Sequence, residues 1–196
     1  LPQVADRAFV QRTVGKGSAH LVRSALAEAG AGPAVALEPA LARYQAHYRA
    51  VNGMYASVYP GVAEGLERLA ARGWLLACLT NKPQAFALAL LQAKGLAGHF
   101  AHVFGGDSFA RTKPDPLPVQ ATCAALGCAP SDTLVIGDSI NDVQAARGAG
   151  CPVVLVSYGY NHGQPAADAG ADAVFDRLDA IDWPLAQGER QASSSG

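Results

Sequence analysis

The 196-residue sequence predicts an α/β fold: a doubly wound parallel sheet accompanied by a small helical domain. From Tyr59-Pro60-Gly61 onward, short apolar runs alternate with segments of helical periodicity, as in parallel strands joined by helices. These runs are apolar throughout, which indicates strands buried on both faces. Before residue 56 only helical periodicity is present. We therefore assign residues 1–55 to a helical cap, 56–186 to the α/β core and 187–196 to a polar tail, expected to be disordered.

Two helices are expected in the cap. Ser18 is a candidate N-cap for a helix whose apolar positions recur to Ala29 and which Gly30 ends. The second covers 41–51, where Tyr44 and Tyr48 share one face.

The elements of the core are bounded by glycine and proline. We expect helices over 62–72, 83–94 and 116–126, followed by a loop and helix over 138–149. The expected strands are 74–79, 102–104, 133–136, 153–156 and 173–175.

Composition excludes several classes of protein. The net charge of -1 gives no basic surface for nucleic acid or for anionic membranes. No apolar run approaches the roughly 18 residues of a membrane-spanning helix, and the first ten residues do not resemble a signal peptide. The four cysteines lack metal-site spacing and suit buried thiols in a reducing cytoplasm, which is the expected location. The oligomeric state is left open.

Chemistry-bearing residues follow three of the predicted strands. Thr80 and Asn81 follow the first, Lys113 lies in the loop after the second, and Asp138 and Asp142 follow the third. Parallel strands present their carboxyl ends at one edge of a sheet, so these side chains should meet there.

The expected cluster suits a phosphate ester and a divalent cation. The Thr80 hydroxyl, and the Asn81 amide or a backbone N–H, are donors for phosphate oxygens, and Lys113 supplies a positive charge. Asp138 and Asp142 are hard oxygen ligands of the kind that Mg²⁺ takes, and a cation between them would relieve their repulsion. The sequence thus predicts Mg²⁺ as cofactor and a small phosphorylated molecule as substrate.

Three segments resemble motifs of the haloacid dehalogenase superfamily. Leu-Thr-Asn-Lys-Pro (79–83) resembles motif II, Gly-Gly-Asp-Ser (105–108) with Arg-Thr-Lys-Pro-Asp-Pro (111–116) resembles motif III, and Val-Ile-Gly-Asp-Ser-Ile-Asn-Asp (135–142) resembles motif IV. Further similarity to its phosphoglycolate phosphatase branch lies at 14–17, 59–62, 145–150 and 158–163.

The resemblance implies a role for each matching residue. Thr80 and Asn81 would bind the transferring phosphoryl group, and Lys113 would orient that group and the nucleophile. Asp138 would bind Mg²⁺ directly, and Asp142 directly or through water.

In the cap, Arg12, Gly15 and Lys16 lie where the family has its substrate-specificity loop, although a flexible turn explains Gly15-Lys16-Gly17 equally well. His162 is interpreted as a surface histidine.

One family motif has no counterpart among these residues. Motif I, Asp-x-Asp-Gly-Thr, supplies the nucleophile and the acid/base aspartate in the family, and its strand lies centrally, between the strands that end at Leu79 and Gly137. We expect that this central strand is missing here, that the sequence is part of a longer enzyme, and that the 196 residues alone are inactive.

The leading hypothesis is a Mg²⁺-dependent phosphatase that hydrolyses 2-phosphoglycolate to glycolate through an aspartyl-phosphate. A non-catalytic remnant that binds phosphate or a protein partner is one alternative. A phosphomutase is another; a dehalogenase needs no metal and does not explain the Asp138/Asp142 pair.

Overall fold

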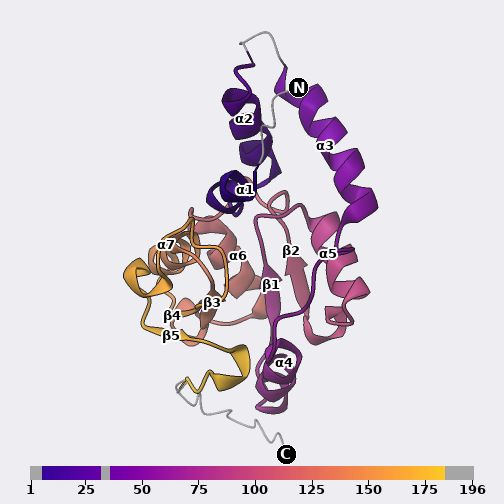
Figure 1. Ribbon diagram of the computed structural model, residues 1–196. Coiled ribbons are helices and arrows are strands. Elements are labelled where there is room, and N and C mark those ends of the chain that lie inside the picture. The colour runs from indigo at the N-terminus through magenta and orange to yellow at the C-terminus, as the bar shows by residue number, and fades with distance from the viewer. Residues whose placement is uncertain (1–5, 32–35, 184–196) are drawn as a thin grey trace, which may run out of the picture.

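The computed structural model describes residues 6–31 and 36–183 (Figure 1). The predicted tail at 187–196 lies outside the described residues. The α-helices are α1 (Arg7–Thr13), α2 (Ser18–Glu28), α3 (Leu37–Val51), α4 (Val62–Ala71), α5 (Gln84–Ala93), α6 (Leu117–Leu126) and α7 (Ile140–Ala149). Short 3₁₀ turns lie at Ala97–His99, Pro130–Asp132, Ala166–Ala169 and Leu178–Ala180.

All the strand pairs in the described residues are parallel, which confirms the predicted α/β class. β1 (Ala77–Leu79) pairs with β2 (His102–Phe104). A separate sheet has the order β3 (Val135–Gly137), β4 (Val153–Val156), β5 (Ala173–Phe175). The predicted bounds of β2, β4 and β5 agree with the structure.

Within the described residues the strands thus form two sheets, where the sequence predicted a parallel sheet without the central strand between those that end at Leu79 and Gly137. In residues 6–31 and 36–183, β1 and β3 each have one strand partner, and each residue of both is half-buried, whereas all of β4 is buried. The expectation that residues 74–79 form a strand buried on both faces was wrong. Leu75 is 61% exposed, and β1 begins only at Ala77, the first residue that pairs with β2.

Helices α6 and α7 pack against each other and join the two sheets: α6 contacts β1 and β2, and α7 contacts β3 and β4. The main apolar core lies where α6 and α7 meet β4, around Val119, Val143 and Leu155. The thiols of Cys123 and Cys151 lie 3.8 Å apart in this core, where burial and the neighbouring Cys123 raise the pKa of Cys151 to about 12. This fits the predicted structural role of these thiols.

Helices α1, α2 and α3 stand together at one end of the molecule, above the strands (Figure 1). Ser18 was predicted to cap α2, but it is the first helical residue and Gly17 occupies the N-cap, at a φ of 88° that favours glycine. Gly30, at φ 66°, follows the end of α2 as predicted. The boundaries proposed for the cap and core stay predictions.

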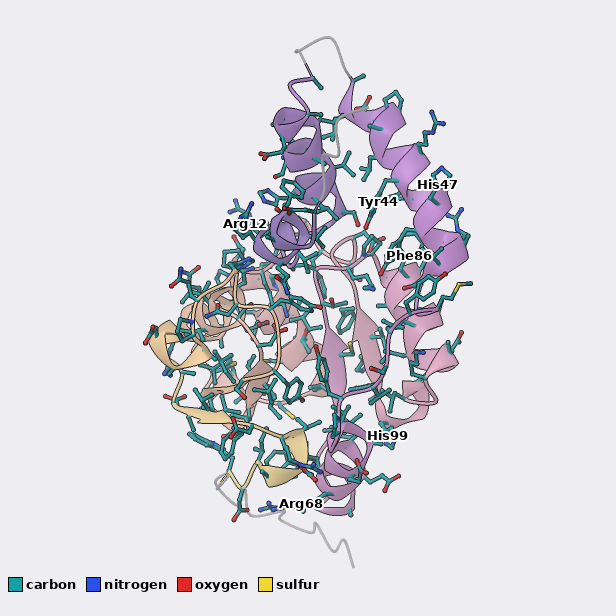
Figure 2. All side chains as sticks on the ribbon, viewed as in Figure 1. Arg12, Tyr44, His47, Arg68, Phe86 and His99 are labelled. Atoms are coloured by element: carbon teal, nitrogen blue, oxygen red, sulfur yellow. The ribbon has the colours of Figure 1, made fainter. Side chains whose placement is uncertain are left out.

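The cap meets the core through α3 and α5. Tyr48 stacks on Tyr44 and lies edge-on to Phe86, with ring centroids 5.6 and 5.2 Å apart, and the Asn52 amide donates to the Phe86 carbonyl. Figure 2 shows Tyr44 and Phe86 at this junction. Within residues 6–31 and 36–183, no helix has both the length and the apolar character needed to cross a membrane.

An ion pair fixes the edge of the second sheet and gives a prediction of acid sensitivity. Asp172 accepts hydrogen bonds from Arg147 on α7 at 2.5 Å and from the Val153 N–H at 2.8 Å. These bonds lower the pKa of Asp172, so its contribution to stability is present above its unfolded-state pKa and is lost as the pH falls through the lowered value. We expect Asp172→Asn to lower stability by about 1 kcal/mol at pH 7, since the Arg147 side chain is exposed enough for solvent to screen it.

The measurement is urea unfolding at pH 7 and at pH 3. The deficit of Asp172→Asn should be smaller at pH 3 than at pH 7, and Asp132→Asn, at an exposed aspartate, should have no effect at either pH. An equal deficit at both pH values would exclude the carboxylate charge as the cause.

Candidate active site

The loop after β1 supplies the hydroxyl of the site. The Thr80 backbone N–H donates to the Phe104 carbonyl and continues the β1–β2 ladder, while its Oγ1 accepts from the Lys82 N–H at 3.2 Å. A hydroxyl that accepts one bond still has its own proton to donate. Thr80 thus presents a donor at the carboxyl end of β1, as the sequence predicted.

Asn81 joins three parts of the molecule. Its amide donates to the carbonyls of Gly15 in the cap, at 2.9 Å, and of Lys113, at 2.8 Å, while its Oδ1 accepts from the Lys113 N–H at 3.0 Å. Both amide protons are therefore in use. The sequence offered the Asn81 amide or a backbone N–H as a donor to phosphate, and the backbone N–H is the one that is still available.

Lys113 bridges the two sheets. Its Nζ donates to the Leu79 carbonyl of β1 at 2.8 Å and to Asp142 Oδ1 at 2.7 Å. Because the Thr80 N–H points toward β2, the alternation of a strand directs the Leu79 carbonyl to the opposite, free edge. Lys113 thus lies between the free edge of β1 and the end of β3, with 12% of its side chain exposed.

Asp142 is held on both of its oxygens. Oδ1 accepts from Lys113, and Oδ2 accepts from the Asp138 and Ser139 N–H groups and the Ser139 hydroxyl, at 2.8 to 3.2 Å. Burial opposes its ionisation, but Lys113 and the other donors outweigh this and lower the pKa of Asp142. Asp142 is therefore a fixed anion at the start of α7, where the helix dipole also favours negative charge.

The pKa of Asp138 is shifted in the opposite direction from that of Asp142. Among the described residues, the Asp138 Oδ2 accepts from the Tyr160 N–H alone, at 3.1 Å. Burial raises the pKa of Asp138, the Tyr160 N–H opposes this, and the Asp142 charge raises it further. The surroundings of Asp138 thus favour a cation.

Glycines make room for both carboxylates. A Cβ on Gly159 would lie 2.1 Å from the Asp138 Cβ, and one on Gly137 would lie 2.3 Å from the Asp142 Cβ.

The residues present fit Mg²⁺ through Asp138. Mg²⁺ commonly takes one or two protein carboxylates and completes its shell with water and substrate oxygens, and one Asp138 oxygen has no hydrogen bond in the described residues. Asp142 fits the water-mediated role better, since Lys113 already occupies its Oδ1. Within the described residues no cluster of three or more His, Cys, Asp or Glu side chains surrounds a possible metal position. A site with one or two protein carboxylates, completed by water and substrate oxygens, is therefore the kind that these residues fit.

These side chains surround one cavity of about 280 Å³ between cap and core. It is lined by Val14, Gly15, Gly17, Ser18, Tyr48, Thr80, Asn81, Lys82, Lys113, Asp138, Ser139, Asn141, Asp142 and Tyr160. The structure thus brings Thr80, Asn81, Lys113, Asp138 and Asp142 together, as the strand order implied.

Of the three specificity residues predicted in the cap, one lines the cavity and two do not. Gly15 lines the cavity, whereas Arg12 and Lys16 are exposed and are not among its lining residues; Figure 2 shows Arg12 on α1. The structure instead adds Tyr48 and Lys82, which sequence reasoning missed. Lys82 could have been predicted to line the cavity, because it directly follows Thr80 and Asn81 in the sequence. For Tyr48 the sequence showed only which face of its helix it occupies, and this does not predict a place in the cavity.

His162 was interpreted as a surface histidine, but it is half-buried beside the cavity. Its Nε2 lies 3.2 Å from the Asn141 amide, and its Cε1 would lie 3.3 Å from a Cβ on Gly15. The His162 backbone is in the left-handed region, at a φ of 51°.

Close packing behind the Thr80 loop predicts a large effect for one methyl group. A Cβ on Gly105 would lie 2.1 Å from the Gln84 backbone nitrogen, far inside any van der Waals contact. We expect Gly105→Ala to destabilise the protein by about 1–3 kcal/mol.

The matched control is Gly98→Ala, because nothing lies within 4 Å of its would-be Cβ; it should be neutral or slightly stabilising. Urea unfolding of both variants tests this, and equal midpoints for the two would contradict the packing argument.

Comparisons with known proteins identify relatives of this chain. A model of the family described as haloacid dehalogenase-like hydrolase matches residues 2–150. A phosphoglycolate phosphatase of Thiobacillus denitrificans is 44% identical over 84% of this chain and 74% of its own length. One of Rhodospirillum rubrum is 46% identical over 91% of this chain and 76% of its own.

A crystal structure described as a predicted phosphoglycolate phosphatase from Haemophilus somnus 129PT superposes with a TM-score of 0.81. The two are 33% identical, and the match covers 89% of this chain and 80% of that one.

Proposed function

Because the chain belongs to the haloacid dehalogenase-like hydrolase family, as a phosphoric monoester hydrolase, we propose that its substrate is 2-phosphoglycolate and that hydrolysis depends on Mg²⁺. The supporting observation is the single cavity at which Thr80, Lys113, Asp138 and Asp142 meet. Relatives that match most of this chain bear the name phosphoglycolate phosphatase, which supports the choice of substrate.

Each group has a proposed part in holding the phosphoryl group. The Thr80 hydroxyl and the Asn81 N–H donate to its oxygens, as expected at the end of a strand before a helix. Lys113, fixed by Leu79 and Asp142, places its charge where the attacking carboxylate and the phosphate approach each other. Bound Mg²⁺ would lower the charge of the phosphate, and Asp138 would hold it with the help of Asp142.

The proposed reaction also requires a nucleophile and an acid/base group. The cavity-lining carboxylates are Asp138 and Asp142; Asp142 is held on both oxygens, and Asp138 is assigned to the metal. We therefore propose that the 196 residues alone do not turn over. Catalysis would need a strand bearing Asp-x-Asp-Gly-Thr, and the free edges of β1 and β3 are the proposed position for it.

The test compares the 196-residue chain with a completed form, in which a segment bearing Asp-x-Asp-Gly-Thr is joined to its N-terminus. Both are assayed on a panel of phosphate monoesters with and without Mg²⁺. We expect hydrolysis by the completed form only, with Mg²⁺ only, and with 2-phosphoglycolate as the best substrate. An inactive completed form that still binds phosphate would favour a non-catalytic protein, and transfer of phosphate within a sugar phosphate would favour a mutase.

A further inference from the structure

Lys82 is a cation in the cavity to which the proposed reaction gives no role. It follows Thr80 and Asn81 directly and lines the cavity. Lys113, the other lysine there, is paired with Asp142, whereas no carboxylate of the described residues lies within 4.0 Å of the Lys82 ammonium. A half-buried ammonium without a counter-ion, facing a cavity, favours an anion.

The Lys82 side chain is held by the cap. Its Nζ lies 2.5 Å from the Tyr48 hydroxyl and 4.9 Å from the centroid of the Tyr48 ring. Tyr48 itself is fixed by its contacts with Tyr44 and Phe86. The ammonium therefore has a defined position on the side of the cavity that α3 forms, while the opposed pair Lys113 and Asp142 belongs to the strand ends.

Lys82 and Tyr48 together offer the hydrogen-bond donors that a carboxylate needs. An ammonium has three donors, and the bond to Tyr48 uses one of them. A Tyr48 hydroxyl that accepts from Lys82 retains its own proton, so two N–H groups and one O–H remain. Two carboxylate oxygens accept such a set, and charge-assisted bonds of this kind are the stronger ones.

The charges in the cavity also point to a substrate with two anionic ends. In the proposed reaction, Lys113, which is paired with Asp142, and Mg²⁺ on Asp138 would both serve the phosphate. Among the cavity-lining residues described, Lys82 is then the cation left for a second anionic group. Building on the proposed function, we propose that Lys82 and Tyr48 bind the substrate carboxylate and so select short phosphorylated carboxylic acids over neutral phosphate esters.

The test measures binding to the 196-residue chain in the presence of Mg²⁺ by calorimetry. The probes are inorganic phosphate, 2-phosphoglycolate and ethyl phosphate, in which a methyl group replaces the carboxylate. We expect Lys82→Met to weaken phosphoglycolate binding roughly ten- to hundred-fold while ethyl phosphate and inorganic phosphate change less than about threefold. Tyr48→Phe should show the same selective loss, smaller in size, and Lys82→Arg should restore part of the preference.

Lys94→Met is the matched control, because it removes the same charge from the C-cap of α5, outside this cavity. It should leave all three affinities unchanged, which separates a local contact from general attraction of a more highly charged ligand. Thermal unfolding of each variant checks that cap and core remain folded.

The outcomes separate this inference from the proposed function. Equal weakening of phosphoglycolate and ethyl phosphate by Lys82→Met, or no weakening of either, would overturn the carboxylate role while leaving the phosphate site in place. A wild-type chain that binds none of the probes would overturn both. Selective loss in Lys94→Met as well would show that the preference is only long-range attraction.

Discussion

Replacing Lys113 by methionine should lower the free energy of unfolding by about 3–5 kcal/mol, because it leaves the Asp142 carboxylate buried without its partner. The two side chains are 12% and 7% exposed and their charged atoms lie 2.7 Å apart. Methionine fills much of the same space, so lost packing adds little. The loss should therefore reflect the unpaired charge.

The double variant Lys113→Met/Asp142→Asn separates charge from shape. Removing both charges of a buried pair costs far less than removing one, and asparagine keeps an oxygen for the Asp138 and Ser139 N–H groups. We expect the double variant to recover most of the stability. Urea unfolding at pH 7 of the wild type, the two single variants and the double variant measures this double-mutant cycle. Strictly additive losses of stability would show that the two groups are not coupled.

The pH dependence gives a second check on this pair. The pKa of Asp142 is lowered from its ordinary 3.8 by Lys113 and its other donors, against the effect of burial. Its stabilisation is present above the unfolded-state pKa and is lost as the pH falls through the lowered value. The deficit of Lys113→Met should therefore shrink in acid. Arg111→Met, which removes an exposed ion pair, should cause no measurable change at any pH.

The same residues show what the sequence allowed us to predict. Strand periodicity located β2, β4 and β5, and parallel strands must end at one edge; hence Thr80, Lys113, Asp138 and Asp142 were expected to meet, and they line one cavity. These positions follow from chain order alone, without knowledge of side-chain packing.

What could not be predicted depends on contacts between distant segments. Tyr48 reaches Lys82 because α3 packs on α5, and a helical pattern does not state which neighbour its face will meet. The sequence offered the Asn81 amide or a backbone N–H as a donor to phosphate, and two carbonyls occupy the amide protons. β1 is shorter than its apolar run because only Ala77–Leu79 pair with β2, and the run itself does not encode how far its partner extends.

Asp138→Asn should abolish the response to Mg²⁺ and at the same time leave the protein as stable or more stable. Burial and the neighbouring Asp142 charge raise the pKa of Asp138, against the Tyr160 N–H, so its ionised form disfavours folding at neutral pH. Asparagine removes that cost while its side-chain oxygen still accepts from Tyr160. A buried charge that costs stability suits a group retained to bind a cation.

Thermal unfolding of the 196-residue chain with increasing Mg²⁺ measures this effect. Mg²⁺ should raise the Tm of the wild type through binding to the folded state and leave that of Asp138→Asn unchanged. In the completed form, the same substitution should lower kcat/KM by about 10²–10³-fold, since the metal contributes several kcal/mol to such reactions. Asp132→Asn, at an exposed aspartate on the surface, should retain both responses. If Mg²⁺ raised the Tm of Asp138→Asn as much as that of the wild type, the metal would not bind at this carboxylate. Metal binding would then no longer explain why two acids follow β3.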